Sequence, residues 1–503
     1  MRFAASERVA SVLRRSGVGV HPLEWRLPPI ETYPWVVAFV QTWKGKLVLF
    51  AVFAALMKPL HNVWFEMTAA AIVVSLAGRY RRYVAVLATG AMLVRIPYWF
   101  GSRPLDELII EQAGIAGAIV PEHLRVATLI GCVPLAAASI WLARHFRNHP
   151  IGRRPVLVEH VLCFALLALA TSHLLRGLPQ IVLWSVTITF IAYFWFLAFA
   201  LMDQRRRAPA PMLLHFATFH PFFAPGTPVP MGRGGGNLKS VEAQTAEELA
   251  VTQIKGLKLL VWAFCLKALL FVSKKAIYGL AGLAPLGQSF EQFVDNGQAP
   301  GPFAIVSLIV NFPEQLLATA IWGHIIVATA RLAGFRLLRN TWRPLSSRTV
   351  AEFWNRYFYY FKEVLVHVYF YPTYIRWFKG HPRLRLAFAT FTAAGVGNFL
   401  FHYILAARSI VEVGLAEALM RSQTYAFYCF LLAAGIIVSQ LRARKFDPDA
   451  GWLRRQLVPS LGVAAFFCIL TFFDGPGRHV TLARHFEFLF HVFGIHGWTQ
   501  AIG

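Results

Sequence analysis

The stretch that decides the fold is "IVLWSVTITFIAYFWFLAFALM", residues 181–202, in which no side chain is charged. About 20 consecutive apolar residues are enough for a helix to cross a bilayer. Inside lipid every backbone N–H and C=O group must be paired within the protein, and a helix achieves this within one segment. We therefore predict a transmembrane helix here.

Further apolar runs lie on both sides of this stretch. Only 15% of the 503 residues are charged, whereas soluble domains carry about 25%. The alternating pattern of β-barrel strands is absent. We predict an all-α polytopic membrane protein with about 10–12 transmembrane helices. The runs fall at about residues 33–43, 46–58, 62–78, 83–100, 125–143, 156–175, 179–202, 256–282, 303–333, 384–407, 424–441, 457–473 and 485–498.

The runs form one expected membrane domain, residues 33–503, after a basic segment, residues 1–32, in the cytoplasm or at the membrane surface. The first three runs, up to residue 78, are short and predict half-spans or re-entrant pieces. A cytoplasmic membrane of a bacterium is the expected location.

The formal net charge is +25, which in a soluble protein would indicate nucleic-acid binding. Here the basic residues lie in short loops, such as "RYRRY" (79–83), "RHFRNHPIGRR" (144–154) and "DQRRR" (203–207). This is the pattern of cytoplasmic loops in membrane proteins, so a nucleic-acid partner is not expected. The loop "GQSFEQFVDNGQAPG" (287–301) has acids and no Lys or Arg, which predicts that it faces outward.

Two stretches are neither simple spans nor ordinary loops. Residues 208–250 are rich in Pro, Gly and Phe, which predicts irregular backbone packed inside the protein. Residues 336–381 contain "RPLSSRTVAEFWNRYFYYF" (343–361), too charged to span and rich in aromatic rings. Such a composition favours the membrane interface, as in an amphipathic surface helix. Ser346 and Ser347 are candidate caps for a helix that begins near Arg348.

A polar pair lies in the apolar run that ends near residue 407. Asn398 and His402 are four residues apart and share one helical face, and Gly395 and Gly397 precede them, where they permit close approach of a backbone or a ligand. A neutral imidazole can take a proton from an alcohol. The residues alone leave open whether His402 is a base or a structural histidine.

Other polar pairs are weaker candidates. Glu363 and His367 are also four apart, as either an oriented acid–base pair or an ordinary helix pair. Glu314 and His324 lie in a further apolar run and are candidates to line the same cavity. No histidine has metal-ligand spacing with a carboxylate or thiol, so no metal site is predicted.

These pieces, in this order, resemble the membrane-bound O-acyltransferase family, in particular its bacterial branch that acetylates polysaccharides or transfers D-alanine. The matched region is residues 208–402. The blocks are "FATFHPFFAPGTPVPMGRG" (216–234), "ATARLAGFRLLRNTWRPLSSRTVAEFWNR" (328–356) and "FATFTAAGVGNFLFH" (388–402).

The resemblance implies a helical bundle around a tunnel, where a cytoplasmic acyl thioester, carried by coenzyme A or a carrier protein, meets an extracytoplasmic glycan or lipid-linked hydroxyl. No cofactor is bound, and acetyl is the expected acyl group. His402 would be the general base and Asn398 would hold the acceptor or orient the ring. Membrane lipids and accessory proteins of a surface-glycan pathway are the expected partners. The implied donor-binding or substrate-binding residues are Arg233, Arg343, Arg348, Trp354, Asn355 and Arg356.

The chain departs from the family pattern at three places. Tyr357 and Phe358 follow "FWNR" where the branch has Trp-His, and Asn355 or His367 is a candidate substitute. His324 stands where an Asp is usual, and the Gly-Pro order is reversed at residues 225–226. A non-catalytic scaffold and a transporter or flippase for a lipid-linked sugar therefore stay open as alternatives. Another kind of membrane transferase is a further alternative.

Overall fold

The computed structural model describes residues 29–95, 103–112, 121–149, 152–172, 174–442, 451–475, 477 and 480–495. Throughout these ranges the regular structure is helical, and the extended pairing is a single antiparallel bridge between Glu242 and Phe335. The all-α polytopic prediction is confirmed. The expected basic segment, residues 1–32, lies almost wholly outside the described residues.

Six helices in the described part of the chain are long and apolar enough to cross a membrane. A seventh results if α2 (Pro34–Gln41) and α3 (Trp43–Met57), bent by 94°, are counted as one broken span. The six are α9 (Leu178–Gln204), α12 with the π-helical turn η3 (Ala246–Leu280), α14 (Ala304–Leu332), α18–η6–α19 (Pro382–Leu405), α21 (Gln423–Leu441) and η7–α22 (Leu453–Asp474).

The predicted 10–12 spans are therefore too many for the described residues. Two apolar helices, α4 (Trp64–Leu76) and α8 (Pro155–Thr171), are shorter than a span needs. The 13 residues of α4 reach only about 20 Å, whereas the hydrocarbon core is about 30 Å thick. The bent α2–α3 pair and short α4 agree with the half-spans predicted for the first three runs.

The remaining helices are not among the candidate spans. The loop predicted at 287–301 is mostly helix α13 (Leu286–Asn296), because Leu286, Phe290 and Phe293 recur on one face and are buried there. The others are α5 (Arg81–Arg95), α6 (Arg103–Gln112), α7 (Pro121–His145), α10 (Leu213–Phe216), α11 (Gly234–Val241), α15 (Val350–Tyr357), α16 (Tyr359–Leu365), η5 (Val366–Phe370), α17 (Tyr371–Arg376), α20 (Ala407–Arg421) and α23 (Leu482–Val492). The 3₁₀ turns are Ile30–Thr32, Gly78–Tyr80 and Pro344–Ser346.

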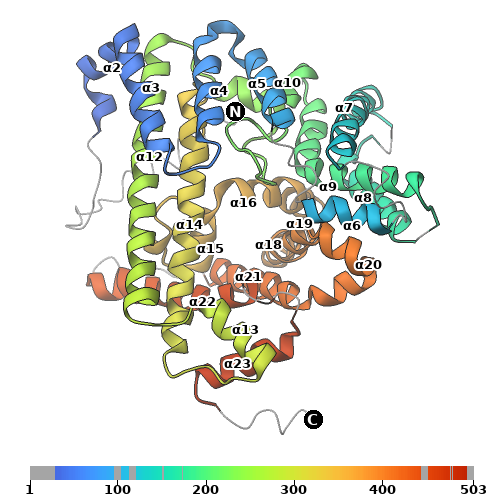
Figure 1. Cartoon of the computed structure of the whole chain (residues 1–503), viewed down its shortest axis with the longest axis vertical. Coiled ribbons are helices and arrows are strands. Elements are labelled where there is room, and N and C mark those ends of the chain that lie inside the picture. The colour runs from blue at the N-terminus through green and yellow to red at the C-terminus, as the bar shows by residue number, and fades with distance from the viewer. Residues whose placement is uncertain are drawn as a thin grey trace.

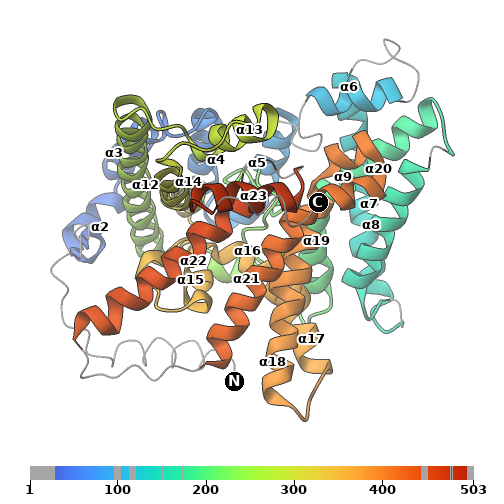
Figure 2. The same ribbon diagram turned by 90° about the horizontal axis from the view of Figure 1, so that it is seen from below.

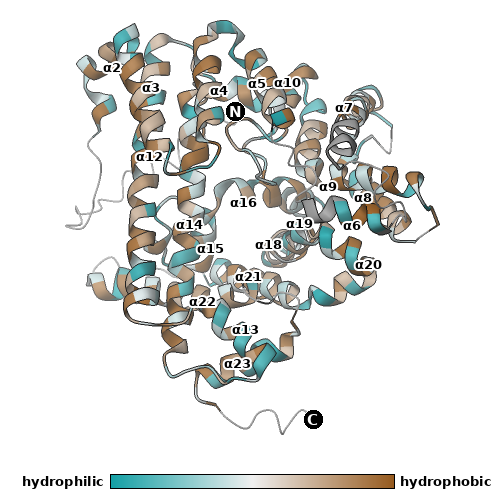
Figure 3. Ribbon diagram, viewed as in Figure 1, coloured by the Kyte–Doolittle hydropathy of each residue, from teal (hydrophilic) through white to brown (hydrophobic). Residues whose placement is uncertain are grey.

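Two groups of helices flank the middle of the molecule. On one side α12 and α14 run side by side (Figure 1). Gly256 permits this approach, because a Cβ there would lie 3.0 Å from the Ala328 carbonyl oxygen. On the other side α7 and α8 pack against α9, and α16 lies between the groups (Figure 1). Figure 3 shows apolar residues along α12 and α14, whereas α13 is more polar.

A third group forms the lower half of the view in Figure 2, where α18, α21 and α22 slant past one another. The connection between α17 and α18 lies at the bottom of this view, and α13 lies in its upper part. Helix α13, which holds the acids of the segment 287–301, thus lies far from the basic turn 376–382, as segments of opposite charge bias do on the two sides of a membrane.

Residues 217–233 have no regular secondary structure yet are largely buried. Phe222, Phe223 and Val229 are among the most enclosed of them. Polar groups fix this irregular backbone, since Thr89 Oγ1 accepts a hydrogen bond from the Phe222 N–H at 3.3 Å and Thr227 Oγ1 accepts one from the Val229 N–H at 3.2 Å. The burial predicted for this Pro- and Gly-rich stretch is confirmed.

Candidate functional site

The helix that carries His402 contains a π-helical turn, η6 (Phe391–Gly397), directly before α19 (Asn398–Leu405). Such turns recur at functional sites. The two glycines of this turn each receive an aromatic side chain. A Cβ at Gly397 would lie 2.4 Å from Cδ2 of Tyr369, and one at Gly395 would lie 3.2 Å from Cδ1 of Phe430. The predicted close approach is therefore made by rings of η5 and α21.

Asn398 and His402 share one face of α19, and both meet Tyr425 of α21. The Tyr425 hydroxyl donates to Asn398 Oδ1 at 3.4 Å, and the rings of His402 and Tyr425 lie 4.6 Å apart. Asn398 is completely buried, and its Nδ2 has no hydrogen-bond partner among the described residues. A buried amide N–H of this kind can donate to a substrate oxygen.

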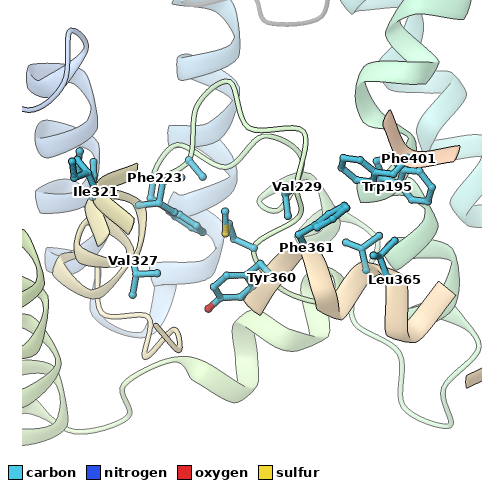
Figure 4. Packing of buried hydrophobic residues seen from close by; sticks show 14 of the residues in the cluster. Trp195, Phe223, Val229, Ile321, Val327, Tyr360, Phe361, Leu365 and Phe401 are labelled. Carbon is cyan, nitrogen blue, oxygen red and sulfur yellow. The ribbon is translucent and has the colours of Figure 1, made fainter. Parts of the chain in front are cut away.

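The half-buried imidazole of His402 lies among aromatic rings. Phe361 of α16 is 5.7 Å away and Phe401 is 5.2 Å away, measured between ring centroids. Phe401 in turn stacks on Trp195 of α9 at 5.0 Å. Figure 4 shows Phe361 between Val229 and the Trp195–Phe401 pair. Three separate stretches of the chain thus meet in one packed region: residues 216–234, the end of 343–361, and 388–402.

The chain reaches this region through a break in the helix at Phe358. Helix α15 ends at Tyr357 and α16 begins at Tyr359. Asn340 replaces the lost helical hydrogen bonds, because its backbone oxygen accepts from Tyr359 N at 2.9 Å and its Oδ1 accepts from Tyr360 N at 3.3 Å. Gly323 leaves room for this, since a Cβ there would lie 2.7 Å from Asn340 Nδ2.

The predicted cap of the preceding helix is wrong by two residues. Ser346 belongs to a 3₁₀ turn, and Thr349 is the N-cap, with its Oγ1 accepting from Glu352 N at 3.1 Å. Glu352 Oε2 accepts in return from Arg348 N at 2.8 Å. This reciprocal Thr-x-x-Glu arrangement satisfies two backbone donors at once, which the serines do not.

The residues implied to bind the donor do not converge. Arg356 is held within its own segment, 2.6 Å from Glu352 Oε1 and 2.7 Å from Ser346 Oγ. Arg343 and Asn355 are exposed and Arg348 is half-buried, while Trp354 is buried against Phe361.

Asn355 does not replace the missing polar residue at Phe358. The Phe358 ring meets Trp322 at 5.8 Å and Phe361 at 5.6 Å, in an apolar setting. Asn355 is exposed to the outside of the helix instead.

Glu363 and His367 do form a pair, with Oε2 and Nε2 separated by 3.3 Å. Burial raises the pKa of Glu363, but the hydrogen bond from His367 and the charges of Lys362, His367 and Arg233 outweigh burial and leave the pKa below its ordinary value. Arg233 is thus close enough to act on this carboxylate. The pair favours a negatively charged carboxylate and an oriented imidazole.

His367 lines a pocket of about 640 Å³ between α8, α9, η5, α17 and α19. Two further polar residues line it. His160 Nε2 and the Tyr369 hydroxyl are 2.8 Å apart, and His160 Nδ1 lies 2.7 Å from the Val156 carbonyl oxygen. Sequence reasoning passed over this histidine, although two ionisable residues in "VLVEHVLCFALL" were a signal.

The neighbouring Glu159 is buried, and both of its carboxyl oxygens have no hydrogen-bond partner among the described residues. Tyr425 is the other residue that sequence reasoning missed. No feature of the apolar run 424–441 distinguishes Tyr425 from the other aromatic residues in that run.

Glu314 and His324 do not form one cluster. Both lie on α14, ten residues and therefore about 15 Å apart along the axis. Glu314 faces Lys274 at 3.6 Å, and the His324 Nδ1 faces the Ala320 carbonyl of its own helix.

Comparisons with known protein families and with curated protein sequences give no match to this chain.

Proposed function

We propose that the protein is a membrane-embedded O-acyltransferase of the bacterial cytoplasmic membrane. It moves an acyl group, acetyl in the simplest case, from a cytoplasmic thioester to a hydroxyl of an extracytoplasmic glycan or lipid-linked acceptor. The observation that carries the proposal is the packing of Phe361, from the arginine-rich stretch, against His402, 5.7 Å away. Trp354 packs on Phe361 in turn, so the stretches 328–356 and 388–402, which resemble one family, come together beside the candidate base.

In this proposal His402 is the general base. Its imidazole takes the proton of the acceptor hydroxyl while that oxygen bonds to the thioester carbonyl carbon. The C–S bond then breaks and the proton passes to the leaving thiolate. Asn398 supports the reaction by offering its buried Nδ2 to the acceptor oxygen or to the developing oxyanion.

The same proposal gives His367 and Glu363 a secondary place. The pair has suitable geometry for acid–base chemistry, but His402 shares its helical face with Asn398, whose buried Nδ2 can donate to a substrate oxygen, whereas the rings beside His367 are those of Phe199 and Tyr371. The apolar surroundings of Phe358 favour the alternative of a non-catalytic scaffold. That alternative predicts full function without His402.

The test compares ester-linked acyl groups on surface glycans and lipids, measured by mass spectrometry. A deletion strain would be complemented with wild type, His402→Ala or His367→Ala at equal protein levels in the membrane. General-base catalysis contributes about 10²- to 10⁴-fold, so His402→Ala should lower one acylated species by at least about 100-fold. His367→Ala should lower it by less than about tenfold.

Three outcomes would contradict this scheme. Full acylation with His402→Ala would remove His402 from catalysis. Loss with His367→Ala alone would move the base to the second pair. Equal acylation in the deletion strain and the wild type would favour the scaffold or a transporter of lipid-linked sugar.

A further inference from the structure

The pocket beside His367 has a strongly basic mouth. Four arginines line it, and all four lie at the ends of helices or in the adjoining turns: Arg153, Arg154, Arg205 and Arg376. No carboxylate among the described residues lies within ion-pairing distance of any of them. All four side chains are exposed, and two of them donate to backbone carbonyl oxygens, Arg153 to Asn148 and Arg205 to Arg153. A bound anion would lower the repulsion among the four like charges.

The walls of the same pocket are apolar. They consist of side chains from α8, η5, α17 and α19: Pro155, Val156, Leu157, Phe164, Val368, Pro372 and Leu400. Its volume of about 640 Å³ lies within the range of ligand-binding cavities. A basic mouth above an apolar wall fits a ligand that is anionic at one end and apolar at the other.

Both walls continue onto exposed apolar surface. On α8, Leu157 lines the pocket and is 55% exposed, and Val161 one turn further is 63% exposed. On the opposite wall Ile375 and Trp377 are exposed beside Arg376. In a membrane protein such surface contacts lipid, and Trp marks the interface level. The apolar end of a ligand can therefore leave the pocket sideways into the bilayer.

The basic mouth also lies on the side predicted to face the cytoplasm. Arg153 and Arg154 end the basic loop 144–154, and Arg205 belongs to "DQRRR". Anionic lipids enrich the cytoplasmic leaflet, and basic pockets between helices on that side bind their headgroups.

We propose that this pocket binds an anionic phospholipid of the cytoplasmic leaflet. The phosphate lies among the four arginines, and an acyl chain follows the apolar wall of α8. The proposal goes beyond acyl transfer and does not depend on it. A soluble phosphate compound such as coenzyme A would satisfy the arginines but would leave the exposed apolar walls without a ligand.

The test uses the purified full-length protein in detergent, with bound lipid counted by native mass spectrometry. The probes are dioleoyl phosphatidylglycerol and, as the neutral lipid of the same chains, dioleoyl phosphatidylcholine. Coenzyme A and inorganic phosphate serve as soluble anions. Wild type should bind phosphatidylglycerol at least about tenfold more tightly than phosphatidylcholine.

The variant is Arg154→Gln with Arg376→Gln, since neither side chain makes a hydrogen bond or ion pair with the described residues. The matched control is Lys379→Gln with Arg383→Gln, which removes the same charge from exposed positions near the pocket that do not line it. The pocket variant should lose about tenfold or more in phosphatidylglycerol affinity, and the control should change it less than about threefold.

Two results would overturn the proposal. Equal lipid affinity in the pocket variant and the control would show that the arginines do not hold the headgroup. Displacement of the lipid by coenzyme A, with coenzyme A binding lost in the pocket variant alone, would assign the pocket to a soluble donor. The latter result would leave the acyltransferase proposal intact.

Discussion

The two histidines that are candidate bases have opposite surroundings. His402 lies in a helix core among Phe361, Phe401 and Tyr425, with an asparagine one turn away. His367 faces an acid 3.3 Å away and lines a pocket with an arginine mouth. An aromatic surrounding excludes water from a reacting hydroxyl, whereas a carboxylate partner fixes the orientation of the ring.

This difference indicates separate roles for the two histidines, one in proton transfer and one in ligand binding. Glu363 fixes the orientation of the His367 ring, and an oriented ring is well suited to contact a ligand in the pocket that it lines. Asn398, on the helical face of His402, has a buried Nδ2 without a hydrogen-bond partner among the described residues, and this group can donate to a substrate oxygen. The comparison therefore favours His402 for proton transfer and the His367 region for ligand contact.

The largest effect on stability is expected where the helix of His402 contacts the His367 region, at Gly397 and Tyr369. Gly397→Ala should destabilise the protein by about 1–3 kcal/mol, because the new Cβ would lie 2.4 Å from Cδ2 of Tyr369. The displaced ring would also lose its hydrogen bond to His160. The measurement is the thermal-unfolding midpoint in detergent.

Gly462→Ala on α22 is the matched control, since nothing lies within 4 Å of a Cβ at that position. It should leave stability unchanged or raise it by up to about 1 kcal/mol. Equal midpoints for the two variants would show that the Tyr369 ring can move aside without loss of stability. The regions around His402 and His367 would then not be rigidly coupled.

A smaller effect should distinguish the two regions by activity. Tyr425→Phe removes the hydroxyl that donates to Asn398, and a hydrogen bond contributes about 0.5–1.5 kcal/mol. Acyl transfer in isolated membranes should therefore fall roughly twofold to tenfold. Tyr369→Phe removes the hydroxyl beside His160 and should change the rate less than about twofold. The reverse order of effects would place the reaction at the His367 pocket.

The smallest effect depends on pH. Glu363 has a lowered pKa in the folded protein, so its ionised form stabilises the fold. That contribution is fully present above the ordinary glutamate pKa of 4.5 and is lost as the pH falls through the lower folded value. Glu363→Gln cannot titrate. The difference in unfolding temperature between wild type and this variant should therefore be constant near neutral pH and should shrink below about pH 4.5.

A control for this experiment is Glu417→Gln, at an exposed pair with Arg421. Exposed pairs contribute little, so its unfolding temperature should follow the wild type across the same range. If the difference in unfolding temperature between wild type and Glu363→Gln grew on acidification, this would contradict a lowered pKa of Glu363 in the folded protein.

The sequence was sufficient for the helical class and for the face shared by Asn398 and His402. The helical periodicity of a sequence predicts which residues share one side of a helix. A long segment without charged residues predicts a membrane-spanning helix. The predicted count of spans exceeds the six or seven candidate spans of the described residues, because hydropathy does not show that α4 is only 13 residues long or that α2 and α3 meet at 94°.

Contacts between distant helices were not predictable in the same way. Tyr425 and Phe361 reach His402 from different helices, and a single sequence carries no signal for such pairs. The arginines of 343–356 illustrate the opposite failure. The family resemblance implied that they bind the acyl donor, but Arg356 pairs with Glu352 in the same helix, four residues earlier.

The π-helical turns η5 and η6 pack against each other beside the candidate site. A π-helical turn is an α-helical turn that holds one extra residue. Deleting one residue within 391–397 should restore a regular α-helix. The side chains before and after the turn would then keep their present orientation. Deleting one residue between Asn398 and His402 would instead rotate the imidazole by about 100° away from Tyr425. We therefore expect single-residue length changes between homologous chains to concentrate at these two turns.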